Sequence, residues 1–99
     1  NVFATAVKMF PNDPIANLNS AILALREKDL DSAAQYLEKA GNSPEAVHAR
    51  GILNMLKGNL TQAKTYLEQA EAAGVKEATA NLKELAKKEA DNAIFDSFK

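Results

Sequence analysis

The chain has 99 residues, of which twelve are basic and thirteen acidic, so its formal net charge is -1. Because the charges are balanced and interspersed, there is no basic stripe to neutralise phosphates, and we expect neither nucleic-acid binding nor attraction to an anionic membrane surface. No apolar stretch is long enough for membrane insertion, and the lack of cysteine excludes disulfides and thiolate ligands.

Residues 2–10 are predicted to form the first helix, because their apolar side chains recur at helical spacing. The prolines and turn-forming residues at 11–14 end this helix, since proline cannot continue it. Asp13 and Pro14 then suit the cap and the first turn of a second helix over residues 14–27.

Four more helices are predicted from caps, terminal glycines and apolar spacing, over residues 30–40, 44–57, 60–72 and 76 to about 90. The last of these has a narrow apolar stripe beneath a charged surface, which is typical of the helix that caps a repeat array. Residues 91–99 are predicted either to extend that helix or to form a loose tail. The chain is therefore predicted to be all-α, with about six helices.

An internal repeat indicates how these helices are arranged. Residues 30–40 reappear as residues 60–70, with six of the eleven positions identical. A period between about 20 and 50 residues is typical of stacked repeat proteins. We expect a single domain over residues 1–99, which divides into the second helix of an incomplete repeat (1–13), two repeats (14–43 and 44–74), and a capping helix with a tail (75–99).

The spacing of small and bulky residues resembles that of the tetratricopeptide repeat (TPR) family. That family has a small residue in the first helix, an alanine twelve positions later, and then a bulky residue and a second alanine. The two units here carry Ala21, Ala33, Leu37 and Ala40, and Gly51, Ala63, Leu67 and Ala70. The resemblance implies a TPR-like α-solenoid of antiparallel helix pairs, in which small residues let paired helices cross within about 8–10 Å. We expect the bulky residues of the second helices to be largely buried, namely Tyr36, Leu37, Tyr66 and Leu67.

Three positions of the first helices depart from the family pattern. An aromatic residue is replaced by Asn17 and Val47, a leucine by Ser20 and Arg50, and a tyrosine by Ala24 and Asn54. The short turns and aromatic-poor units are similar to degenerate repeats of larger bacterial envelope proteins, which implies the cell envelope or periplasm, with the cytoplasm as the alternative. The chain begins without Met and inside a repeat, so we expect it to be a fragment of a larger protein.

The resemblance implies a non-catalytic scaffold module that binds a protein or peptide partner on the concave face of its first helices. By the same resemblance, an apolar peptide groove would be lined by Leu18, Asn19, Ile22, Arg26, His48, Ile52 and Met55. The alternative is that these residues pack against adjacent helices or another domain, and that the repeats serve as a structural spacer or docking domain within a larger protein.

Enzyme activity and cofactors are not expected, because no nucleophile sits in a strained turn and no glycine-rich loop could form an oxyanion hole. His48 is the only histidine, and without cysteine or a nearby carboxylate cluster it cannot complete a metal site. It is alternatively a surface histidine that packs on a neighbouring helix. The apolar residues of the predicted helix over 2–10 lack half of their partners, which predicts self-association through this open N-terminal end.

Overall fold

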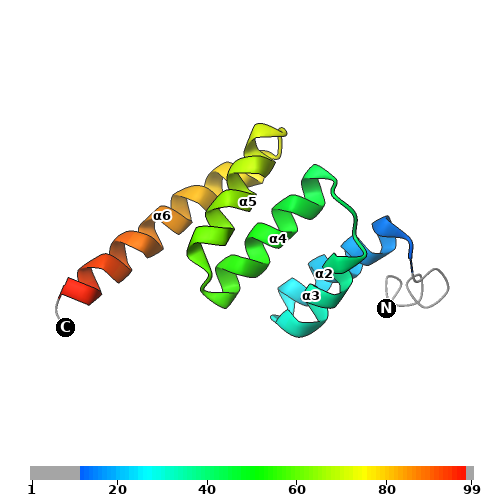
Figure 1. Ribbon diagram of the computed structural model, residues 1–99, viewed down its shortest axis with the longest axis horizontal. Coiled ribbons are helices and arrows are strands. Elements are labelled where there is room, and N and C mark those ends of the chain that lie inside the picture. Colours follow the sequence, from blue (N-terminus) through cyan, green and yellow to red (C-terminus); the bar gives the residue numbers. More distant parts are fainter. Residues whose placement is uncertain (1–11, 98–99) are drawn as a thin grey trace.

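The computed structural model describes residues 12–97, which fold into five helices and contain no strand (Figure 1). The helices are α2 (Pro14–Arg26), α3 (Leu30–Glu38), α4 (Pro44–Lys57), α5 (Leu60–Ala72) and α6 (Lys76–Ser97). The prediction of an all-α repeat fold is confirmed. The predicted helix over 2–10, and with it the expected surface for self-association, lies outside the described residues.

Local capping signals set where the helices begin. The Asp13 carboxylate accepts a hydrogen bond from the Ile15 N–H at 2.9 Å, and a proline occupies the first position of both α2 and α4. Asp29 and Ser43 cap α3 and α4 by accepting from the backbone N–H three residues further on. Each of these caps satisfies a donor that a helix N-terminus leaves without a partner.

The turns after α2, α4 and α5 share one geometry. The N–H groups of Asp29, Asn59 and Val75 donate to the carbonyl oxygens five residues earlier, at 2.8–3.0 Å. This bond is formed when the residue just before the donor adopts a left-handed backbone. Glycine supplies that conformation after α4 and α5, whereas Lys28 supplies it after α2, with a φ of 58°.

The left-handed Lys28 leads to a prediction about stability. Lys28→Gly is expected to raise the free energy of unfolding by about 1 kcal/mol, because this conformation costs an L-residue roughly 1–2 kcal/mol and glycine almost nothing. Urea denaturation would measure the change. Lys39→Gly is the control, since Lys39 has a φ of -106°. If both substitutions raised the free energy of unfolding equally, the lost charge would account for the effect, and the backbone explanation would be contradicted.

α6 runs further than residues 76–90 and ends at Ser97, so of the two predicted alternatives for the C-terminal residues the structure has the extended helix. No glycine or proline occurs between residues 76 and 97 to interrupt the helix. Its C-terminal half continues past the end of α5, as Figure 1 shows in orange and red, and its residues 86–94 are exposed.

The helices form two layers. α2 packs on α3, α4 packs on α5, and α6 packs on α5. Further contacts of α2 with α4 and of α4 with α6 join these three helices into an inner layer (Figure 1). α3 and α5 form the outer layer and do not contact each other. The surface of the inner layer is therefore continuous across three helices.

Paired helices approach closely where one of them carries a small residue. A Cβ atom placed on Gly51 of α4 would lie 2.7 Å from Leu67 Cδ2 and 2.8 Å from Leu67 Cγ, which is closer than such atoms pack. Leu67 is itself fully buried, as are Ala33 and Ala63 of the second helices. The small-residue spacing in the sequence therefore marks where the helices of a pair cross.

Filling this crossing point should separate α4 from α5. Gly51→Leu is expected to lower the free energy of unfolding by roughly 3 kcal/mol, because a leucine overpacks the site against Leu67. Thermal or urea unfolding followed by circular dichroism would report the loss. Lys57→Leu, on an exposed position of the same helix, should change stability by about 0.5 kcal/mol or less. Equal stability of the two variants would show that the crossing lies elsewhere.

The core consists of two clusters of buried residues. The first joins α2, α3 and α4 through residues such as Ala21, Leu37 and Leu53. The second joins α5 and α6 through residues that include Leu67 and Leu85. Ile52 of α4 packs against both clusters and so links the two halves of the stack.

The two tyrosines are less buried than predicted. Leu37 and Leu67 are 2% and 0% exposed, as expected, but Tyr36 and Tyr66 are only partly buried. Each tyrosine directly precedes its leucine, so its side chain is rotated by about 100° around the helix. That rotation moves the ring from the core to the edge of the helix pair.

Four polar residues stand at the positions that depart from the family pattern, namely Asn17, Ser20, Arg50 and Asn54, and two of them are held by local bonds. Asn17 and Asn54 each donate from the side-chain amide to the carbonyl four residues earlier, on Asp13 and Arg50, at 2.9 Å. The Ser20 hydroxyl is buried and has no hydrogen-bond partner among residues 12–97. Asn17 is 1% exposed, so its bond offsets the loss of hydration of a fully buried amide.

Arg50 fixes the short turn between α3 and α4. Its Nη2 donates to the carbonyl oxygens of Leu37 at 2.9 Å and Gly41 at 2.6 Å, and its Nη1 donates to Asn42 Oδ1 at 3.3 Å. The guanidinium thereby satisfies carbonyls at the end of α3, where a positive charge also suits the helix dipole. Arg50 thus binds the turn through hydrogen bonds from a position where the family has leucine.

Removing the guanidinium should loosen this turn. Arg50→Met keeps most of the side-chain length but removes the donor to the Gly41 carbonyl and one of the donors to the Leu37 carbonyl, which also accepts from the Ala40 N–H, so the free energy of unfolding should fall by about 1.5–3 kcal/mol. Arg26→Met is the matched control, because Arg26 is exposed and forms no such bonds. If both variants unfold at the same urea concentration, Arg50 does not stabilise the turn.

Candidate functional site

Two neighbouring hollows lie on the inner layer. The larger, of about 370 Å³, is lined by Ile22, Leu25, Arg26, Glu45, His48, Ala49, Ile52, Val75 and Glu77. The smaller, of about 300 Å³, is lined by Ile52, Met55, Leu56, Asn81, Glu84 and Lys88. Because Ile52 lines both, we treat them as one groove across α2, α4 and α6. Each hollow lies within the range of volumes that ligand pockets have in proteins, about 300–1,000 Å³.

The groove brings together five of the seven residues expected on the concave face. Ile22, Arg26 and His48 line the larger hollow, Met55 lines the smaller one, and Ile52 lines both. The other two residues, Leu18 and Asn19, line neither hollow, and Leu18 packs against the first core cluster instead.

The contributions of α6 and of Glu45 in the first turn of α4 were not expected from the sequence. Val75 and Glu77 complete the larger hollow, and Asn81 and Glu84 belong to the smaller one. The signal that could have revealed them is the seven-residue spacing of Ala46 and Leu53, which recurs as Ala78 and Leu85. All four of these residues are buried, so α6 repeats the packing of α4.

A hydrogen bond between His48 and Asn81 joins α4 to α6. His48 Nε2 lies 2.7 Å from Asn81 Oδ1, and the bond is partly buried. Because a carboxamide oxygen only accepts hydrogen bonds, Nε2 carries the proton in this arrangement. His48 lines one hollow and Asn81 the other, so the pair lies between them. His48 therefore both lines the groove and packs on a neighbouring helix.

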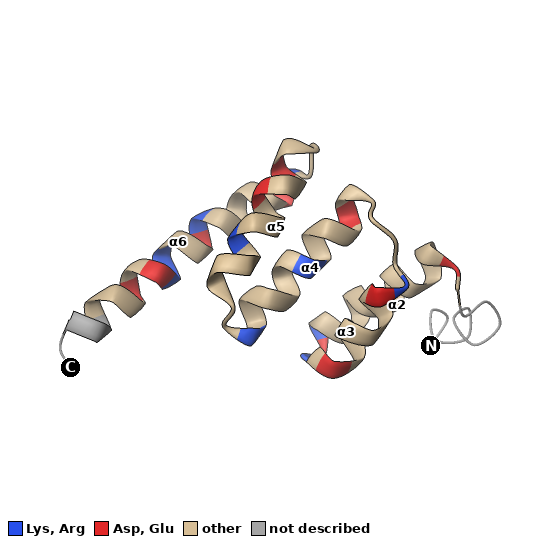
Figure 2. Cartoon of the chain, in the orientation of Figure 1, with Lys and Arg blue, Asp and Glu red and all other residues tan. Residues whose placement is uncertain are grey.

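The larger hollow has an apolar floor and charged groups around it. Ile22, Leu25 and Ile52 provide apolar surface, while Arg26, Glu45 and Glu77 are exposed. Glu45 and Glu77 lie in the first turns of α4 and α6. Within the described part of the chain, these three charged side chains form no ion pair. Figure 2 shows basic and acidic residues interspersed along α6, and none of the helices is uniformly basic.

Comparison with known proteins assigns the family. A family model described as tetratricopeptide repeat matches residues 1–47. This part of the chain belongs to the tetratricopeptide repeat family. The match spans the predicted helix over 2–10, all of α2 and α3, and the first turn of α4, so it includes Ala21, Ala33, Leu37 and Ala40. A search of curated proteins and a search of solved structures gave no match.

Tetratricopeptide repeats are in general protein–protein interaction modules and are typically not catalytic. The inner layer of α2, α4 and α6 corresponds to the face that the family resemblance assigns to partner binding. Among the described residues, no group of three or more His, Cys, Asp or Glu side chains is placed to hold a metal ion. No helix within residues 12–97 is long and apolar enough to cross a membrane.

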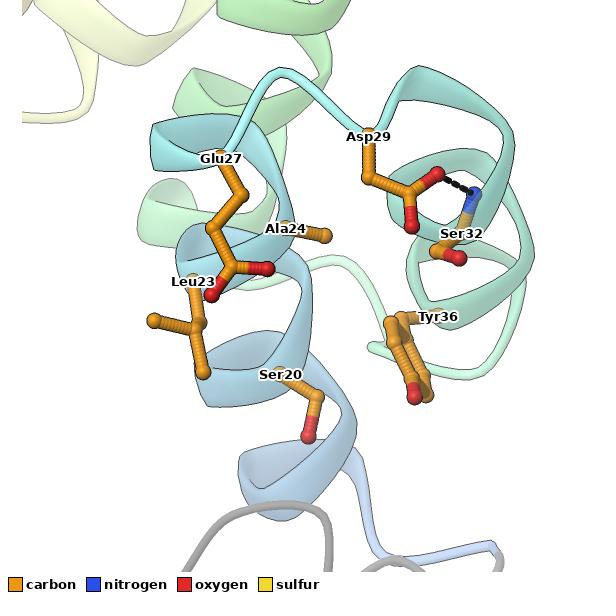
Figure 3. A pocket seen from close by; sticks show the side chains of 7 residues that line it. All are labelled: Ser20, Leu23, Ala24, Glu27, Asp29, Ser32 and Tyr36. Atoms are coloured by element: carbon orange, nitrogen blue, oxygen red, sulfur yellow. Dashed lines mark hydrogen bonds between the residues drawn. The ribbon is translucent and has the colours of Figure 1, made fainter. Parts of the chain in front are cut away.

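A smaller hollow of about 110 Å³ lies between α2 and α3, outside the groove (Figure 3). Ser20 of α2, Glu27 at the C-terminal end of that helix, and Ser32 and Tyr36 of α3 line it. Asp29 also lines this hollow, but its carboxylate accepts from the Ser32 N–H at 3.2 Å and caps α3. The hollow has about a third of the volume of the smallest ligand pockets, so the groove is the better candidate site.

Proposed function

We propose that this chain is a non-catalytic interaction module that binds an apolar peptide segment of a protein partner in the groove of its tetratricopeptide repeats. The observation that carries the proposal is the pair of adjoining hollows on the inner layer, which meet at Ile52. Helix-in-groove recognition uses such an apolar surface for affinity, while surrounding polar groups give the peptide its direction.

The repeat organisation supports the same proposal. We propose that α2 with α3 and α4 with α5 are the two repeats, and that α6 caps the array. On the spacing that relates Ala46 to Ala78, Gly51 corresponds to Lys83, which is exposed. A lysine there prevents the close crossing that Gly51 allows, so a second helix would not pair with α6 in the same way. α6 can therefore complete the groove without a second helix of its own.

A test of the groove must separate binding from folding. Ile52 is unsuitable for a charged substitution, because it packs against both core clusters and its loss would disturb the stack. Ile22 lines the larger hollow but belongs to neither cluster. Ile15 is on the same helix, is 72% exposed and lines neither hollow, so it offers a matched control.

Ile22→Asp is expected to weaken binding of an apolar peptide at least ten-fold, or about 1.4 kcal/mol, because it puts a charge into the floor of the larger hollow. The ligand would be an apolar peptide selected against the wild-type protein from a displayed library, and fluorescence anisotropy would give its dissociation constant. Ile15→Asp should bind as the wild type does. Thermal unfolding of both variants would establish that they are folded.

Equal affinity of the wild type and a folded Ile22→Asp variant would contradict the groove proposal. The alternative role is that of a structural spacer or docking domain within a larger bacterial protein, such as one of the cell envelope. In that role the groove would have no peptide ligand. In that case the library would yield no peptide whose binding depends on Ile22.

A further inference from the structure

The chemistry around the larger hollow narrows the class of peptide that it can take. Glu45 and Glu77 both line this hollow, and each lies in the first turn of its helix. Because α4 and α6 are adjacent first helices, their N-terminal ends bring the two carboxylates to the same hollow. Arg26, in the last turn of α2, is the one basic side chain among its lining residues.

We propose that the groove selects a peptide segment whose apolar residues are followed at one end by a lysine or arginine, which pairs with Glu45 and Glu77. This inference rests on the proposed function and adds the charge of the partner. Arg26 lines the same hollow. The ligand is therefore an apolar segment with a basic residue at one end.

Two observations favour a basic residue as the selected feature. The hollow carries two carboxylates and one guanidinium, so its lining has a net charge of -1 when His48 is neutral. All three groups are exposed and form no ion pair among the described residues, so they are available to a ligand. An acidic peptide end would have to approach both carboxylates, and like charges repel.

The expected selectivity is modest. Exposed ion pairs are weak, and the partial positive charge at each helix N-terminus offsets part of each carboxylate. We expect a peptide with a basic end to bind about fivefold more tightly than one with an acidic end in its place, which is the scale of such exposed pairs. The preference should diminish at about 1 M salt, where the screening length falls to about 3 Å.

The experiment uses synthetic peptides that share one apolar segment selected against the wild type and differ at a single flanking position, as Lys, Gln or Glu. Both ends are tested, and dissociation constants are measured by fluorescence anisotropy. At one end, the Lys peptide is expected to bind about fivefold better than the Glu peptide, with Gln between them. In the double variant Glu45→Gln/Glu77→Gln, the three peptides should bind alike.

The matched control is Glu38→Gln/Glu68→Gln, which removes two exposed carboxylates from the outer-layer helices α3 and α5 and so changes the net charge equally. It should keep the wild-type preference. Three results would overturn the inference. They are loss of the preference in this control, persistence of the preference in Glu45→Gln/Glu77→Gln, and equal binding of Lys and Glu peptides at both ends. The Gln peptide tests the proposed function separately, because its binding must be weakened by Ile22→Asp. If Ile22→Asp weakens its binding but the Lys and Glu peptides bind equally, only the inference about charge fails.

Discussion

The close crossing of paired helices is the constraint on which the rest of this structure depends. Gly51 lets α4 approach α5 until the Leu67 side chain occupies the space that a Cβ atom would need. Because Leu67 is then completely buried, the crossing also forms the centre of the second core cluster. The orientation of α5 in turn positions α6, which packs on α5. One missing side chain therefore determines where the third helix of the inner layer lies.

The groove is a consequence of this stacking and is not held by any one element. Its lining comes from α2, α4 and α6, which are far apart in sequence and are aligned by the helices of the outer layer. Ile52 shows the connection most directly, since it lines both hollows and contacts both core clusters. Most polar residues of the groove are exposed and remain hydrated, so the inner surface combines apolar and charged side chains.

The sequence was sufficient to predict the helices of residues 12–97 and the all-α repeat fold, because caps, turns and small residues act locally or at a fixed spacing. Asp13, Asp29 and Ser43 were recognisable as caps, and the spacing of small residues located the crossing of α4 and α5 at Gly51. The partial exposure of the tyrosines was missed, although each directly precedes its buried leucine and is therefore rotated by about 100° away from the core. The bonds of Arg50 and the contact of His48 with Asn81 involve residues 8–33 positions apart, which no local pattern encodes.

The His48–Asn81 bond suggests how ligand binding and the shape of the array are connected. It joins α4 to α6 between the two hollows, so it helps to set the distance between the helices that line both. A peptide long enough to fill the larger and the smaller hollow must pass this bond and touch Ile52. Because Ile52 also contacts both core clusters, a ligand at that point contacts the same residue that holds the repeats together. Binding to both hollows should therefore favour one spacing of α4 and α6, since a ligand stabilises the conformation to which it binds more tightly.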